Sequence, residues 1–287
     1  MRPSTRMVVL GGRKLLTPAA LGSSLALWLD ADDASTITLN GLTVSQWRDK
    51  SGNGRHAVQA TAANQPIYNA TGLNTKPVLG FDGTNSFMQA GDNTTWRFLH
   101  DGSKYIISGV WKPGAIDTPG SRAMIAMTTS NTTGSGGVGQ YFAFGDSFGF
   151  RYNVTSGGSG LSFVSVSRAY TGVLGSFGNF SIIDFQLDPA NIIAGNRCFA
   201  SIDGGAPIGG NTPTGGVTSA NSAGSLILGG LSNTTSNRFL GDIAELLIIR
   251  TEQSVNIQLI QGYLAHKWGL TANLPSDHPF KFTPPLA

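Results

Sequence analysis

Short apolar segments separated by turn residues constrain this sequence more than any other feature. They begin near Leu25, are rich in β-branched and aromatic residues, and are bounded by Gly, Asn, Asp or Ser. Segments of this kind are typical of β-strands. They cover residues 25–31, 43–49, 78–83, 104–112, 123–129, 140–144, 148–154, 161–167, 180–188, 197–204, 225–230 and 241–250. The pattern predicts an all-β protein with many turns.

The composition indicates one folded domain preceded by an arm. Glycine is abundant at 39 residues, and charged residues make up 12% of the chain, against about a quarter in typical domains. We find no fixed-period repeat and no linker-like stretch after residue 25, so we expect residues 23–287 to form a single sandwich domain. Residues 1–22 show mixed charge and no sustained period. We expect them to be an anchoring or assembly arm; the alternative is a frayed terminus.

Charge and cysteine usage exclude several classes. The net charge of +3 is spread over the chain without a basic run, so nucleic acid is not an expected partner. The apolar run MVVL near the start is too short for a secretory signal, and no stretch approaches the roughly 20 residues that span a membrane. The single Cys198 cannot form an internal disulfide, and it shares a strand face with Ala200 and Ile202, which indicates a core position.

One helix is expected near the end of the chain, over residues 254–268. Ser254 can cap its start, Gly269 can end it, and Pro275 prevents it from resuming. Helical spacing relative to Ile260 places three residues on or beside the packed face, where we expect them to form a structural clasp against the sandwich. These clasp residues are Tyr263, Leu264 and Trp268.

Two motifs that suggest catalysis have the wrong context. GDSFG (145–149) matches a nucleophile elbow around Ser147, but a strand follows it where that motif needs a helix. GSGGVG (134–139) matches a dinucleotide fingerprint, but the strand-like QYFAF follows it. We interpret the first as a hairpin turn and the second as a loop.

The acidic residues and histidines do not form a catalytic or zinc-binding pattern. The chain has only two glutamates, Glu245 and Glu252, an odd seven residues apart, whereas a glycosidase pair on one strand face needs an even separation. Alternation in the segment 241–250 makes Glu245 a partly buried structural acid. The four histidines show no paired ligand spacing. We therefore expect no enzyme activity and no zinc.

Calcium is the one cofactor that the sequence leaves open. Asp82, Asn85 and Asp92 are the best candidate ligands, because they lie in loop-like sequence and carry oxygen donors. The alternative is that these residues form turns through their own side chains.

Four segments read together resemble a known superfamily. They are WRDKSGNGRHA (47–57), KPVLGFDGTNSFMQ (76–89), GDIAELLIIR (241–250) and GYLAHKWGLTANLPSDHPFK (262–281). In this order they resemble laminin-G-like members of the concanavalin A-like lectin/glucanase superfamily, of the type found in bacteriophage virion and bacterial surface proteins. The resemblance covers about residues 25–285. It implies a jelly-roll-like sandwich of two antiparallel sheets, calcium near the rim, and glycans or proteins bound by loops or the concave face. The Glu-x-Asp-x-x-Glu strand of the glucanase members is absent.

Three functions follow from this reading. The first is a non-catalytic structural protein of a virion or a cell surface, homo-oligomeric and bound to other subunits through the arm. The second is a carbohydrate-binding module at a cell surface or outside the cell, in which exposed aromatics contact the sugar; Trp96, Trp111 and Tyr170 lie near loop-like stretches. Core packing is the alternative role for these aromatics. The third is a polysaccharide hydrolase.

Overall fold

The computed structural model describes residues 15–114, 120–127, 137–144, 149–155, 178–188, 190–193, 197–209, 221, 224–231, 237–251 and 255–286. Several predicted features lie outside the described residues: most of the arm, the strand at 161–167, Ser147, Tyr170, Glu252 and the side chain of Cys198.

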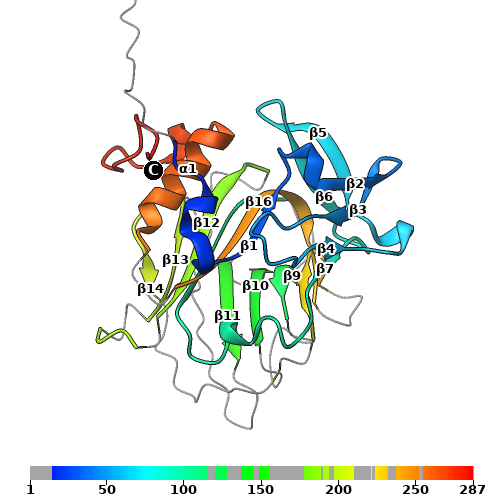
Figure 1. The fold of residues 1–287 in the computed structure, drawn as a ribbon, viewed down its shortest axis with the longest axis horizontal. Helices are drawn as coiled ribbons and strands as arrows, with labels where there is room; N and C mark the ends of the chain where they lie inside the picture. The colour runs from blue at the N-terminus through cyan, green and yellow to red at the C-terminus, as the bar shows by residue number, and fades with distance from the viewer. Residues whose placement is uncertain are drawn as a thin grey trace, which may run out of the picture.

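The protein is an all-β sandwich with a C-terminal helix, as the sequence predicts (Figure 1). Every ladder between two named strands is antiparallel. The strands are β1 (Leu25–Asp30), β2 (Ile37–Asn40), β3 (Thr43–Trp47), β4 (Ala57–Val58), β5 (Ile67–Leu73), β6 (Lys76–Asp82), β7 (Met88–Ala90), β8 (Tyr105–Pro113), β9 (Gly120–Ala126), β10 (Gly137–Phe144), β11 (Gly149–Thr155), β12 (Ser181–Leu187), β13 (Cys198–Ile202), β14 (Ile208–Gly209), β15 (Leu226–Leu228) and β16 (Leu240–Arg250).

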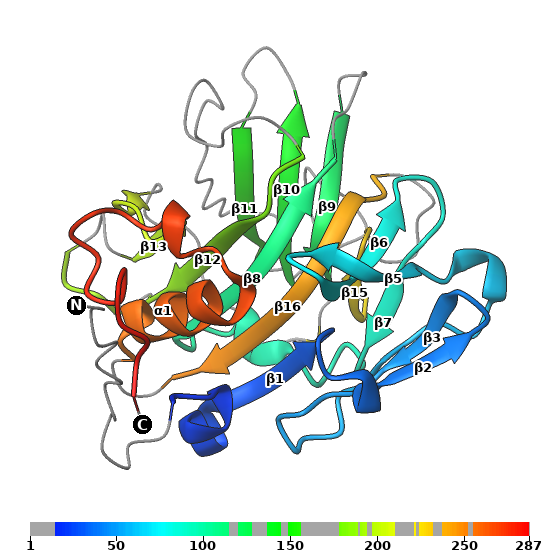
Figure 2. The ribbon, with the colours of Figure 1, turned by 90° about the horizontal axis from the view of Figure 1, so that it is seen from above.

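The strands form one continuous hydrogen-bonded path that curls on itself (Figures 1 and 2). Its order is β11-β10-β9-β15-β7-β4-β3-β5-β6-β16-β8-β12-β13-β14, with β1 added beside β16 and β2 beside β3. The long strand β16 is central. It pairs with β8 on one edge; on the other edge it pairs with β6 near its start and with β1 near its end.

The apolar run of β16 explains this central place. Every residue from Ile243 to Ile249 is buried, so both faces of the strand are covered. Strands that are buried on both faces have near-continuous apolar sequences. The largest side chains with almost no exposure are Trp47, Trp96, Trp111, Trp268, Tyr105, Phe185 and Phe239.

Helix α1 (Ile257–Trp268) packs beside β8 and β12 (Figure 2). The predicted cap at Ser254 is corrected: Asn256 is the N-cap, because its backbone is extended and its side chain accepts a hydrogen bond from the amide of Gln258. The helix ends where expected, with Gly269 in the left-handed conformation at φ 70°. Short 3-10 helices occur at η1 (Pro18–Ser24), η2 (Ala34–Thr36), η3 (Ala62–Asn64), η4 (Arg97–Leu99) and η6 (Thr271–Asn273).

The described part of the arm lies against the C-terminal tail. Leu15 forms an isolated bridge with Leu286, and the amide of Leu16 donates to the carbonyl of Pro285. The two ends of the described chain therefore meet beside α1.

Candidate functional site

The two described aromatics expected to contact sugar are core residues. Trp96 is 0% exposed and Trp111 is 1% exposed, and the indole nitrogen of Trp96 donates to the carbonyl of Ala90 at 2.7 Å. A ring that is closed off on both faces cannot stack on a ligand. The expectation for these two tryptophans is therefore corrected. Tyr170 is outside the described residues.

The calcium candidates are engaged in their own turns. The Oδ1 atom of Asp82 accepts from the amides of residues 84, 85 and 86 and from the hydroxyl of Ser86. Asp92 is held in the same way by Thr94 and Thr95. These bonds lower the pKa of both carboxyls, against burial in the case of Asp82. Among the described residues, no three His, Cys, Asp or Glu side chains form a group that could hold a metal ion.

Both catalytic-looking motifs lie next to strands. The residues of GDSFG connect β10 to β11, which pair antiparallel with Ala143 opposite Gly149. GSGGVG runs into β10. Neither motif leads into a helix.

The clasp residues surround one carboxylate. Leu264 and Trp268 are 0% exposed, and the partly buried Tyr263 packs against the same core. The hydroxyl of Tyr263 donates to Glu245 Oε1 at 2.8 Å, and the indole nitrogen of Trp268 donates to Oε2 at 2.6 Å. A third donor, the indole nitrogen of Trp28 on β1, reaches Oε1 at 2.7 Å.

Two lysines neutralise the acids at this point. Asp30 lies opposite Glu245 in the pairing of β1 with β16 and is 3% exposed. Lys267 bonds to both carboxylates, at 2.6 Å from Asp30 and 2.8 Å from Glu245. Lys50 binds the second oxygen of Asp30 at 2.8 Å and lies over the ring of Trp28.

This network is closed. Both oxygens of Glu245 hold two donors each, and its side chain is fully shielded from solvent. Burial raises the pKa of Glu245, and the charge of Lys267 opposes that rise. A buried acid left without partners would strongly destabilise the fold. These four contacts therefore offset the cost of burying Glu245 in β16. The network ties β1, β16 and α1 together.

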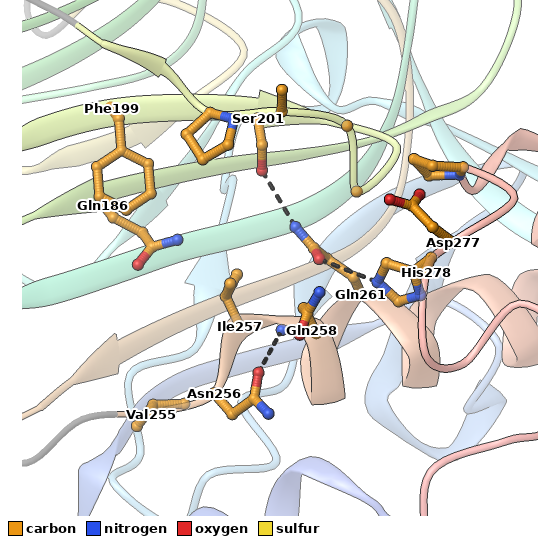
Figure 3. Close-up of a pocket in the computed structure, with 15 residues that line it drawn as sticks. Gln186, Phe199, Ser201, Val255, Asn256, Ile257, Gln258, Gln261, Asp277 and His278 are labelled. Atoms are coloured by element: carbon orange, nitrogen blue, oxygen red, sulfur yellow. Dashed lines mark hydrogen bonds between the residues drawn. The ribbon is translucent and has the colours of Figure 1, made fainter. Parts of the chain in front are cut away.

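A pocket of about 660 Å³ opens between α1, the β12–β13 pair and the C-terminal tail (Figure 3). This volume lies within the range of small-molecule sites. It is lined by Gln186, Phe199, Ser201, Gly204, Gly205, Ala206, Pro207, Val255, Asn256, Ile257, Gln258, Gln261, Pro275, Asp277 and His278.

Strand register builds the floor of this pocket around Asp184. Asp184 lies opposite Ser108 on β8 and opposite Ser201 on β13, and it is fully buried. Both serine hydroxyls donate to its carboxylate, and Gln261 on α1 donates to it at 2.7 Å. Burial raises the pKa of Asp184 to about 6, against the lowering effect of these three donors.

The same floor fixes the state of His278. Because the amide nitrogen of Gln261 donates to Asp184 and to Ser201 at 3.1 Å, its oxygen faces Nε2 of His278 at 3.3 Å. An amide oxygen only accepts, so Nε2 carries the proton. The amide of Phe280 donates to Nδ1 at 3.2 Å, so Nδ1 has none. His278 is thus held neutral, in line with its pKa, which burial lowers.

The rim of the pocket, which we define as Gln186, Gln258 and Asp277, differs from the floor in the pairing of its polar side chains. The side chains of Gln186, Gln258 and Asp277 have no hydrogen-bond partner within the part of the chain that the structure describes. Gln258 and Asp277 are exposed, and Gln186 and the ring of Phe199 are half-buried. In Figure 3, Phe199 and Gln186 lie at one end of the pocket and Asp277 and His278 at the other. The arrangement is a rigid, saturated floor below a rim of free amides.

Sequence reasoning did not find this pocket. Two signals were present. Asp184 is an acid with apolar residues on both sides inside the segment 180–188, and Gln258 and Gln261 are amides three residues apart on a helix, which places them on one face. What brings them together is the pairing of β12 with β8 and β13, which the sequence pattern does not specify.

Comparison with models of protein families gives no match, and neither does comparison with characterised protein sequences. Solved structures do match. The sialidase of Trypanosoma rangeli in complex with sialic acid has a TM-score of 0.54 at 11% identity, over 85% of this chain and 33% of that one. The chain therefore spans about a third of the sialidase. Domain 4 of AbnA, a GH43 extracellular arabinanase from Geobacillus stearothermophilus in complex with arabinotriose, has a TM-score of 0.52 at 18% identity, over 79% of this chain and 92% of that domain. The binding domain of botulinum neurotoxin serotype D has a TM-score of 0.52 at 14% identity, over 82% of this chain and 50% of that one.

The matches agree with an all-β sandwich fold. At these identities the likeness concerns the fold alone, and it agrees coarsely with the concanavalin A-like architecture that the sequence predicts. Within the described residues, no helix of the sandwich has the length and apolarity needed to cross a membrane.

Proposed function

We propose that this protein is a non-catalytic carbohydrate-binding domain that acts outside the cell or at a surface, with its ligand in the pocket between α1, β12–β13 and the tail. The observation that carries the proposal is the rim of free amide side chains above a floor whose own polar groups are already paired. Such a site can bind a polar ligand without rearranging its own hydrogen bonds.

The chemistry of the rim suits sugars. A primary amide offers a donor and an acceptor in one plane, and a hydroxyl group can act as either. Gln186 and Gln258 supply two such groups, and the free Nδ2 of Asn256 adds a donor. Phe199 and Ile257 supply apolar surface for the C–H face of a sugar ring. The matching domain of the arabinanase, solved with arabinotriose, lends support to the same reading.

The absence of catalysis is part of the proposal. Hydrolysis of a glycoside needs two carboxyl groups that flank the scissile bond. Asp277 is the one carboxylate in the lining of the pocket, since Asp184 lies behind Ser201 and Gln261. His278 also holds both ring nitrogens in structural bonds.

The narrower prediction, a bacteriophage virion or surface component that assembles through residues 1–22, remains a prediction. Residues 1–14 lie outside the described residues. Purifying the particle or complex that contains this chain, with and without residues 1–22, would test it: loss of assembly on deletion supports the virion role. Bound calcium and a homo-oligomeric state likewise remain predictions.

A glycan array tests the carbohydrate proposal. We expect the full chain to bind at least one class of glycan, and we expect Gln258→Ala with Gln186→Ala to weaken that binding at least about tenfold, because two polar anchors are lost. The matched control is Gln46→Ala, a half-buried glutamine on β3 that is absent from the pocket lining. Binding that persists in the double variant would place the ligand elsewhere; depolymerisation of a bound polysaccharide would refute the non-catalytic role.

A further inference from the structure

We infer that the pocket selects neutral glycans and rejects acidic ones such as sialylated, uronate or sulfated sugars. The inference rests on the proposed carbohydrate-binding function and names the ligand class for that same pocket.

The charges of the lining carry the inference. Among the described residues that line the pocket there is no lysine or arginine, and the one formal charge they carry is the carboxylate of the exposed Asp277. Recognition of a carboxylate, sulfate or phosphate uses arginine or lysine, and arginine above all for bidentate contacts. An acidic sugar would meet no cation in this pocket, and it would meet one carboxylate of its own sign.

Two lysines and a histidine near the elements that line the pocket are engaged in other contacts. The Lys281 ammonium donates to the backbone carbonyls of Ala272 and Leu274. Lys104 pairs with Asp188, the residue directly after β12, at 2.8 Å. His278 is held neutral by its two hydrogen bonds, so it contributes no positive charge at neutral pH. None of these three groups adds a free cation to the described lining of the pocket.

The first turn of α1 is the remaining feature that could attract an anion. Helix N-termini bind anions through free backbone amides. Here the side-chain oxygen of Asn256 accepts from the amide of Gln258 at 3.0 Å and so occupies that position. The amide-rich rim then acts on hydroxyl groups, which is the chemistry of neutral sugars.

A binding panel tests the inference. The full chain is titrated with neutral fragments, including arabinotriose and short galactan, xylan and mannan oligosaccharides. It is also titrated with acidic ones, including sialyllactose, digalacturonate and a sulfated disaccharide. We expect the best neutral ligand to bind at least about tenfold more tightly than any acidic one, because an acidic ligand would meet the carboxylate of Asp277 in the described lining. A tenfold ratio corresponds to about 1.4 kcal/mol. We also expect Asp277→Lys to narrow the ratio, because it replaces the like charge with a cation.

The outcomes separate the two proposals. Acidic ligands that bind as tightly as neutral ones, and that lose affinity in Gln258→Ala, would overturn the neutral class and leave the carbohydrate site standing. No binding by either group would overturn the site and the class together. Asp277→Asn accompanies the lysine variant, because it removes the charge with little change of shape; an unchanged neutral-to-acidic ratio in both folded variants would contradict the charge argument.

Discussion

The indole nitrogen of Trp268 donates a hydrogen bond of 2.6 Å to Oε2 of Glu245, and both side chains are 0% exposed. This contact joins the last turn of α1 to the centre of β16. Because Glu245 has no access to water, each donor around it replaces part of the solvation that burial removed. The stability of the helix and the central strand is therefore coupled through this bond, together with the contacts of Tyr263 and Lys267 to the same carboxylate.

Replacing Trp268 separates its two contributions. Trp268→Ala removes the ring and the donor, and we expect the free energy of unfolding to fall by about 3–5 kcal/mol. Trp268→Phe keeps an aromatic ring but leaves Glu245 with one donor fewer, at a cost of about 1–3 kcal/mol. Chemical denaturation of the two variants measures both numbers. A Trp268→Phe variant as stable as the wild type would show that the hydrogen bond adds nothing, and equal losses in the two variants would show that the packing of the ring adds nothing.

His266 is the control on the same helix. It is half-buried, and its Nε2 lies 2.8 Å from the carbonyl of Phe280. His266→Ala should cost only about 0.5–1.5 kcal/mol, the net contribution of one hydrogen bond. A loss as large as that of Trp268→Ala would mean that the tail, rather than Glu245, holds the helix.

The charge of Glu245 is needed as much as its shape. Glu245→Gln leaves Lys267 paired with Asp30 alone and brings an amide donor among three other donors. Breaking a buried ion pair from one side costs about 3–5 kcal/mol, and we expect a loss of this size. Asp242 lies on the same strand as Glu245 and forms a partly exposed ion pair with Lys112 of β8. Asp242→Asn removes this pair, so it should cost no more than about 1 kcal/mol. Thermal unfolding of Glu245→Gln and Asp242→Asn measures the two losses of stability. Losses of similar size in both variants would contradict this account.

Gly262 gives a prediction opposite to helix propensity. Glycine to alanine inside a helix normally stabilises by up to about 1 kcal/mol. A Cβ at Gly262, however, would lie 2.6 Å from Cβ of Phe280 in the tail. We therefore expect Gly262→Ala to lower the free energy of unfolding and to increase hydrogen exchange of the tail amides at 275–286. A stabilised variant would show that the tail moves aside freely.

The buried Asp184 makes stability depend on pH. Its pKa is raised from 3.8 to about 6, so the folded state holds this proton more tightly than the unfolded state. The stabilisation is complete below pH 3.8 and is lost as the pH rises through about 6. The difference in unfolding free energy between the wild type and Asp184→Asn should fall by about 2 kcal/mol from pH 4 to pH 7. A difference that is constant or grows with pH would contradict this account.

The strands were predictable where one face or both faces are buried. The segments that became β8, β12 and β16 are rich in apolar residues and are buried along almost their whole length, and their boundaries in the structure lie within one residue of the predicted ones. By contrast, β2 and β5 escaped prediction, because they are mostly exposed and their sequences ITLN and IYNATGL show little hydrophobic pattern. An exposed strand is determined by its neighbour in the sheet, which the sequence does not state.

Side-chain roles were predictable only from local pattern. Alternation correctly indicated that Glu245 faces the interior, but its donor Trp28 is 217 residues away in the chain. Trp111 was expected to be available to a ligand because it lies near a loop-like stretch, yet β8 continues past it to Pro113 and the ring is buried. The pocket depends on three elements that only the fold brings together.

Mapping the ligand onto the backbone amides tests the central claim most directly. In NMR titrations of the full chain with the best-binding neutral oligosaccharide, we predict that the perturbed amides cluster at residues 199–207, 255–261 and 275–278, the elements that line the pocket. Perturbations confined to another face of the sandwich, with these amides unchanged at saturation, would contradict the account.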